Sequence, residues 1–231
     1  NEDSSTEDKH ISSLAAKDVD GIIYISTKSD VKQIYKDYKI PVVHIDRRPE
    51  HAGTLIISDN EMGGFLATEA LIKDGCKDIL MLSDKNYYST TRNRYKGYVD
   101  AHEKYSLPLN EGNVIKTDVS YASSYDAIKK VIADGKKFDG IFCNNDMMAL
   151  GALQALKDSG ISVPEKCKIV GFDDITLSEI CDPPLTTIQQ DTDMFGKKSV
   201  ETLLNLIENN EIKNKNDIYV IPVKLVKRTT A

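Results

Sequence analysis

The feature that most constrains the fold of this chain is a regular alternation of short apolar runs with segments of helical periodicity. The apolar runs are rich in β-branched residues, as in DGIIYI (20–25), DILML (78–82) and KIVGF (168–172). Between such runs lie segments whose apolar residues fall near one helical face, as over residues 60–73 and 147–158. This alternation predicts βαβ units and therefore an α/β fold built on parallel sheets.

The predicted strands are too numerous for one small sheet, so we expect two sheets. The connection from Asp173 to Thr186 also contains no crossover helix of normal length. A length of 231 residues, of which 40% are hydrophobic, is sufficient for two lobes that bury a substantial core.

Polar residues follow several predicted strands at the points where the strands end. Asp46 follows PVVHI, Asn145 follows GIFC, Asp173 follows KIVGF, and Gln190 ends the run TTIQQ. The carboxyl ends of parallel strands meet at one edge of a sheet, which is the edge where ligands bind in open α/β folds. The sequence therefore predicts a ligand site assembled from residues that are far apart along the chain.

Charge and hydropathy exclude two kinds of partner for the chain itself. A net charge of -6 and a pI near 5.3 make it a poor nucleic-acid binder, because affinity for DNA begins with cations that face phosphates. No run approaches the roughly 18 consecutive apolar residues of a membrane span, and the first twenty residues are polar and acidic, unlike a signal peptide. We therefore expect a cytoplasmic protein.

Residue types that carry catalysis or bind metals show no functional spacing. The four cysteines form no C-x-x-C pair, and the four histidines show no ligand spacing, so reduced thiols and no metal are expected. The common nucleotide-binding, nucleophile-elbow and zinc-protease motifs are lacking. Asp173 and Asp174 are adjacent carboxylates, but neighbours at a strand end point in different directions. We expect no enzyme activity and no cofactor.

Three polar residues, Asn144, Asn145 and Asp146, separate the strand GIFC from an apolar helical segment. Asn and Asp are favoured at helix N-caps, so capping accounts for one or two of them. Our interpretation is that Asn145 contacts a ligand, while Asn144 or Asp146 caps the helix.

Four stretches, in this order and spacing, resemble the effector-binding core of the LacI/GalR family of bacterial transcriptional regulators. They are NNDMMALGAL (144–153), GISVPEKCKIVGFDDI (160–175), DPPLTTIQQD (182–191) and PVKLVKRTT (222–230). The likeness extends from about Asp18 to Thr230. It implies a type I periplasmic-binding-protein-like fold, in which two discontinuous Rossmann-like lobes with parallel sheets hold a small molecule between them.

The resemblance also implies where the lobes divide. Residues 1–59 and 191–219 would form the N-terminal lobe, and residues 60–190 and 220–231 the C-terminal lobe. Family members carry a helix-turn-helix headpiece, a hinge helix and a first core strand and helix before the segment that matches residues 1–23. The sequence has no counterpart of these elements, and we interpret the chain as part of a longer regulator.

Matched one residue at a time, the family's motifs imply a set of ligand-binding side chains: Asp46, Arg94, Asn145, Asp173 and Gln190. Arg94 would donate to ligand hydroxyls, and Asn145 can both donate and accept. Asp173 can accept from two vicinal hydroxyls. This mixture of donors and acceptors favours a neutral sugar over a nucleobase or a phosphosugar.

Two features leave the ligand class open. Arg47, Arg48 and Arg92 are close in sequence to site residues, and one of them facing the ligand would favour a phosphate. Sugar sites also use an aromatic face. Val119 stands where relatives carry an aromatic residue, and Tyr121 is the candidate replacement. If Tyr121 does not stack on the ligand, stacking is weak or comes from the strand that the chain lacks.

The resemblance implies the sensor core of a cytoplasmic, homodimeric transcriptional regulator, and we expect it to act as a repressor. A small-molecule effector would change operator affinity allosterically, and operator DNA would be bound through an N-terminal helix-turn-helix that this sequence lacks. The alternative is an exported sugar-binding protein of a transport system, which shares the fold and the site.

Overall fold

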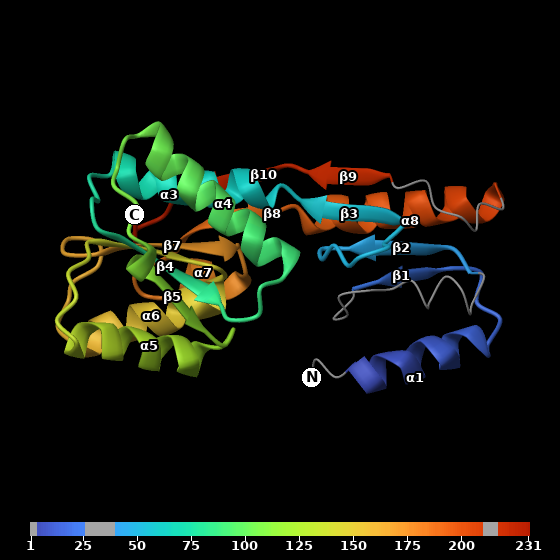
Figure 1. Ribbon diagram of the computed structural model, residues 1–231, viewed down its shortest axis with the longest axis horizontal. Coiled ribbons are helices and arrows are strands. Elements are labelled where there is room, and N and C mark those ends of the chain that lie inside the picture. The colour runs from blue at the N-terminus through green and yellow to red at the C-terminus, as the bar shows by residue number, and fades with distance from the viewer. Residues whose placement is uncertain (1–3, 26–39, 210–216) are drawn as a thin grey trace. The chain divides into compact units, whose positions relative to one another are not determined.

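The computed structural model describes residues 4–25, 40–209 and 217–231 (Figure 1). The chain divides into two compact units. Unit 1 comprises residues 1–58, 88–90 and 191–222, and unit 2 comprises residues 59–87, 91–190 and 223–231. The lobe boundaries that the resemblance implies, after residues 59, 190 and 219, remain a prediction and are distinct from the limits of these two units.

Unit 2 is built on a six-stranded sheet with the order β10-β8-β7-β6-β4-β5 among the described residues. Its strands are β4 (Ile79–Asp84), β5 (Val114–Thr117), β6 (Gly140–Cys143), β7 (Lys168–Asp173), β8 (Thr186–Gln190) and β10 (Val223–Val226). All neighbouring pairs are parallel except β10 with β8, which is antiparallel. The prediction of parallel sheets is therefore confirmed for five strands of this sheet, whereas β10 runs antiparallel to its neighbour β8.

Helices cover both faces of this sheet. The helices α3 (Asn60–Lys73) and α4 (Ser89–Lys104) lie on one face, and α5 (Tyr121–Ala133) and α6 (Asp146–Asp158) lie on the other (Figure 1). Each face has its own hydrophobic cluster, with Met81 and Phe142 on the α3 side and Leu82 and Ile141 on the α6 side. Burial on both faces explains why residues 79–82 of β4 and the whole of β6 form uninterrupted apolar runs.

Short elements complete unit 2. The 3-10 helix η1 (Glu111–Asn113) precedes β5, and α7 (Thr176–Ile180) lies in the connection between β7 and β8. With five residues, α7 is too short for a normal crossover helix, as the sequence indicated.

Unit 1 contains a parallel sheet with the order β1-β2-β3-β9 among its described residues. Its strands are β1 (Ile22–Tyr24), β2 (Val42–Ile45), β3 (Thr54–Ser58) and β9 (Ile218–Ile221). The helix α8 (Thr192–Glu208) packs Leu206 against Val43 and Ile56, while α1 (Ser4–Ala15) packs Ile11 against Ile22 and Val42. The expectation of two sheets is confirmed.

In the described residues, no helix combines the length and the apolar character that a bilayer crossing requires.

Candidate functional site

Arg94 occupies a buried position on α4, with 6% of its surface exposed. Its guanidinium carbon lies 3.5 Å from the centre of the Phe172 ring, close enough for a cation–π contact. Its Nε donates to Oδ1 of Asn60 at 2.7 Å, and its Nη1 donates to the Asn144 carbonyl at 2.5 Å. Contacts from three directions therefore fix the orientation of this side chain before any ligand binds.

The close approach of α3 and α4 brings Arg94 to Asn60. The helices approach at glycines: a Cβ on Gly97 would lie 2.5 Å from the amide nitrogen of Phe65, where ordinary contact begins at 3.4 Å. A Cβ on Gly64 would lie 2.8 Å from the carbonyl carbon of Arg94. Only residues without a side chain allow the backbones this close, so the two glycines determine where Arg94 sits.

Asp173 ends β7 beside Arg94. Its Oδ1 accepts a hydrogen bond from Nε2 of Gln190 at 2.7 Å and lies 3.9 Å from Nη2 of Arg94. The three side chains come from a helix and two strand ends that are separate in sequence, as expected for the carboxyl edge of a parallel sheet. We call Arg94, Asp173 and Gln190 the Arg94 cluster.

Asn145 caps its own helix. Its Oδ1 accepts from the backbone N–H of Met148 at 2.9 Å, and its backbone is extended, with φ of -153°. The expectation that Asn144 or Asp146 would cap α6 is therefore wrong. The cap uses the side-chain amide oxygen of Asn145. A contact of this residue with a ligand stays a prediction.

The two neighbours of Asn145 have other roles. The Asn144 carbonyl accepts from Arg94, and its side-chain nitrogen lies 3.4 Å from Oγ1 of Thr91. The Asp146 carboxylate is fully buried and accepts from the hydroxyls of Thr187 at 2.5 Å and Ser178 at 2.7 Å. Burial raises the pKa of the Asp146 carboxyl, and these hydrogen bonds oppose that rise. Neither residue was predicted to have these roles.

Asp46 and Tyr121 lie outside the Arg94 cluster as defined here, Asp46 in unit 1 and Tyr121 on another helix of unit 2. Asp46 belongs to unit 1, directly after β2, with a positive φ of 68° and its N–H bonded to the Ile56 carbonyl at 2.9 Å. Tyr121 is the first residue of α5 and is exposed. Their predicted contacts with a ligand stay predictions.

Arg47 and Arg92, two of the arginines that could favour a phosphate ligand, each contact a tyrosine residue. The Arg47 guanidinium lies 4.0 Å from the centre of the Tyr88 ring within unit 1. Nη1 of Arg92 donates to the Tyr87 carbonyl at 3.1 Å. Within the described ranges, no three His, Cys, Asp or Glu side chains gather as a metal site requires.

Comparison with known proteins supplies the family. Residues 68–231 match a family described as the periplasmic binding protein-like domain. The HTH-type transcriptional repressor PurR of Pasteurella multocida (strain Pm70) is 32% identical over 224 residues, covering 95% of this chain and 67% of the relative. PurR of Haemophilus influenzae (strain PittEE) is 32% identical over 226 residues, with the same coverage.

Solved structures agree. The complex of the transcriptional regulator CelR with cellobiose matches with a TM-score of 0.88 and 28% identity, over 97% of this chain and 69% of that one. A LacI family transcriptional regulator from Enterococcus faecium with bound ribose matches with a TM-score of 0.85 and 26% identity, over 96% of this chain and 83% of that one. The chain belongs to the LacI/GalR family of transcriptional regulators.

This LacI-family core corresponds to the effector-binding part of such regulators. Its relatives are transcriptional repressors and regulators, which favours this function over that of an exported transport protein. These relatives are not enzymes.

Two residues that orient Arg94 in this LacI-family core, Asn60 and Phe172, were missed by the sequence analysis. Phe172 directly precedes Asp173, so the strand-end pattern was a usable signal. Asn60 begins α3, where a polar residue is ordinary, and its partner lies 34 positions later. No local pattern identifies such a pair.

Proposed function

We propose that this core senses a neutral sugar at the carboxyl ends of β6, β7 and β8, and that binding changes the affinity of the whole regulator for operator DNA. The observation that carries the proposal is the Arg94 cluster, in which a fixed guanidinium stands beside a carboxylate and an amide. Asn145 and Asp46 complete the proposed set, with Tyr121 as the proposed aromatic face.

The cluster suits vicinal hydroxyl groups. One ligand hydroxyl can accept from the Arg94 guanidinium while its neighbour donates to the Asp173 carboxylate, since the nearest atoms of the two groups are 3.9 Å apart. The opposite charges of Arg94 and Asp173 offset one another, so the cluster presents no net positive charge to a phosphate. Arg92 and Arg47 also have partners of their own, since Nη1 of Arg92 donates to the Tyr87 carbonyl and the Arg47 guanidinium lies over the Tyr88 ring.

Two relatives support a sugar ligand. CelR was solved with cellobiose, and the Enterococcus faecium regulator was solved with ribose. Both have the same fold as this chain at 26–28% identity, which supports the ligand class without selecting one sugar.

We further propose that the regulator is a cytoplasmic homodimer and acts as a repressor. Leu177 and Ile180, two apolar residues of α7, are exposed and lie in the connection between β7 and β8. We call these two side chains the apolar patch, and exposed apolar side chains of this kind are typical of a subunit interface.

The operator contact is proposed to come from a helix-turn-helix segment of the full-length regulator, because the core itself carries a net charge of -6. The named relatives are HTH-type repressors.

Calorimetry tests the ligand and the site together. D-ribose, cellobiose, ribose 5-phosphate and hypoxanthine are titrated into the wild-type core and into Arg94→Lys and Asp173→Ala. We expect a neutral sugar to bind and both substitutions to raise its Kd at least about tenfold, as loss of a charged hydrogen bond predicts. Lys227→Met, an exposed residue paired with Asp74 at 3.1 Å, is the control.

Two outcomes contradict the proposal in different ways. Binding of ribose 5-phosphate or hypoxanthine in place of the neutral sugars would show that the ligand class is wrong. Equal affinity of wild type and both variants for a sugar would show that the site is wrong.

A further inference from the structure

The turn that follows β7 is strained at two successive residues. Asp173 has φ of 113° and Asp174 has φ of 59°, values that residues with a side chain rarely adopt. Such a conformation persists only where surrounding contacts determine it. We call these two residues the Asp173–Asp174 corner.

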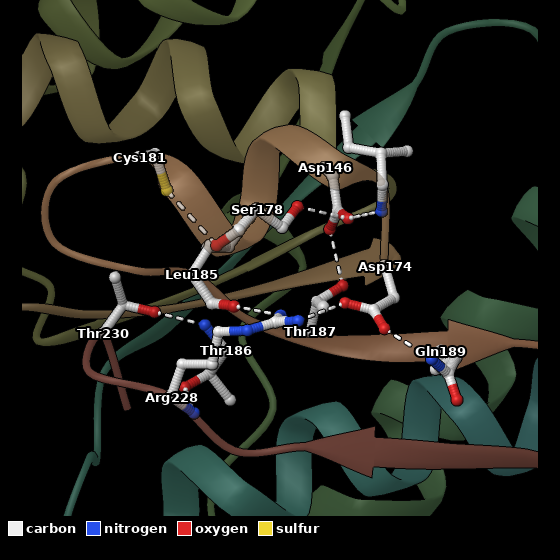
Figure 2. A network of polar contacts seen from close by, with 11 residues as sticks. Asp146, Asp174, Ser178, Cys181, Leu185, Thr186, Thr187, Gln189, Arg228 and Thr230 are labelled. Atoms are coloured by element: carbon white, nitrogen blue, oxygen red, sulfur yellow. Dashed lines mark hydrogen bonds and ion pairs between the residues drawn. The ribbon is translucent and has the colours of Figure 1, made fainter.

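Both carboxylate oxygens of Asp174 are engaged (Figure 2). Oδ1 accepts from Nη2 of Arg228 at 2.7 Å, and Oδ2 accepts from Nε2 of Gln189 at 2.6 Å. Arg228 is fixed in turn, because its Nη1 donates to the Leu185 carbonyl at 2.9 Å and its backbone N–H donates to Oγ1 of Thr186 at 2.9 Å. The ion pair therefore joins the corner to the start of β8 and to the segment after β10.

The residue after the corner is anchored separately. The N–H of Ile175 donates to Oδ2 of the buried Asp146 carboxylate at 3.0 Å. Figure 2 shows Asp146 between Ser178 on one side and Thr187 on the other. Asp174 and Ile175 are thus held by two different carboxylate networks.

The two corner side chains differ in exposure. The Asp174 side chain is 9% exposed and fully engaged with Arg228 and Gln189, whereas the Asp173 side chain is 29% exposed and belongs to the Arg94 cluster. The two side chains engage different partners, Asp174 with Arg228 and Gln189, and Asp173 with Gln190 and Arg94. Because both residues belong to one strained turn, holding the Asp174 side chain in place also restricts the direction in which the Asp173 side chain points.

We propose that Arg228 is a positioning residue for ligand binding: its ion pair with Asp174 holds the strained corner so that Asp173 presents its carboxylate to the ligand. Arg228 itself need not touch the ligand. The inference rests on the proposed function, in which Asp173 contacts the sugar.

The geometry requires an arginine. Two nitrogens of one guanidinium reach two different acceptors, the Asp174 carboxylate and the Leu185 carbonyl. A lysine carries a single nitrogen at the end of a flexible chain and cannot reproduce this fixed fork. Arg228→Lys should therefore keep the charge and restore only part of the affinity that Arg228→Met loses.

A double-mutant cycle separates positioning from general stability. The probe is D-ribose or cellobiose, whichever binds the wild-type core more tightly, and its Kd is measured for Arg228→Met, Asp173→Ala and the double variant. We expect Arg228→Met to raise Kd about tenfold in the wild-type background and to have no further effect once Asp173 is Ala. The control Lys227→Met should leave Kd unchanged. An equal effect of Arg228→Met in both backgrounds would overturn the proposal, because Arg228 would then act without Asp173.

Amide hydrogen exchange tests the same inference without a ligand. Loss of the ion pair should speed exchange of the Ile175 amide at least about tenfold relative to Lys227→Met, since the corner next to it loosens. Unchanged exchange there overturns the proposal, whichever probe binds. If Asp173→Ala leaves Kd unchanged while exchange of Ile175 is faster in Arg228→Met, the proposed site is wrong and the corner's dependence on Arg228 stands.

Discussion

Gly97→Ala places a methyl group at the closest point between α3 and α4. The added Cβ would lie 2.5 Å from the Phe65 amide nitrogen and 2.9 Å from the Gly64 carbonyl carbon. Both neighbours are backbone atoms, which cannot rotate away as a side chain can. Since ordinary contact begins at 3.4 Å, the two helices must separate by about 1 Å.

This separation has two expected costs. Overpacking of a tight contact destabilises a protein by about 1–3 kcal/mol. The bond from Arg94 Nε to Asn60 Oδ1, now 2.7 Å, crosses the two helices and would stretch beyond hydrogen-bonding range. A hydrogen bond to a charged group contributes about 1.5–3 kcal/mol, so sugar affinity should fall about tenfold or more.

Urea unfolding and calorimetry measure the two effects on the same preparation. Gly196→Ala on α8 is the matched control, because a Cβ there meets no atom within 4 Å. It should raise the unfolding free energy by about 0.5–1 kcal/mol, as expected for Gly to Ala in an exposed helix. If Gly97→Ala shows the same gain and an unchanged Kd, the close approach of α3 and α4 does not determine the position of Arg94.

Three further predictions follow from other contacts. Ile180→Asp puts a charge into the apolar patch, at a residue that is 70% exposed, and light scattering should show that the core shifts from dimer to monomer. An unchanged mass would show that the patch is not part of the subunit interface. Asp146→Ala leaves three donors, the Ile175 N–H and the hydroxyls of Ser178 and Thr187, without their acceptor, and should lower the unfolding free energy by about 2–4 kcal/mol. The control Asp158→Ala, at an exposed position, should lower it by about 0.5 kcal/mol or less. Burial lowers the pKa of the His44 imidazole from 6.5 to about 4, with the Glu7 carboxylate opposing, so the unfolded chain binds a proton in this range that the folded chain does not. The unfolding free energy should therefore fall by roughly 3 kcal/mol between pH 6.5 and pH 4 in wild type and by clearly less in His44→Gln, and parallel curves would contradict this assignment.

The sequence predicted the sheets because strand formation here depends on local pattern. The apolar run GIFC predicted β6 correctly, and all four of its residues are buried. Asp173 and Gln190 came together because parallel strands end at one edge of the sheet. The antiparallel β10 was not predicted, since a short strand carries no sign of the direction in which it will pair.

The side-chain partners were harder to predict for two physical reasons. Asn at the end of a strand suits both a helix cap and a ligand contact, so residue type could not assign Asn145 to its cap. The partners of Arg94 depend on a helix crossing permitted by Gly64 and Gly97, which is a long-range packing effect. The contact of Asp174 with Arg228 spans 54 positions and has no local signature.

The order of segments in unit 2 affects how it can form during synthesis. Its chain leaves after Gln190, supplies residues 191–222 to unit 1, and returns for β10 and the segment that carries Arg228. On the ribosome, where segments emerge in order at about 5–20 residues per second, β4 to β8 are complete before Arg228 has been made. A nascent unit 2 therefore has an unpaired edge on β8 and an Asp174 without its cation for several seconds. Ligand-binding competence should arise late in translation, after most of the sheet has already folded.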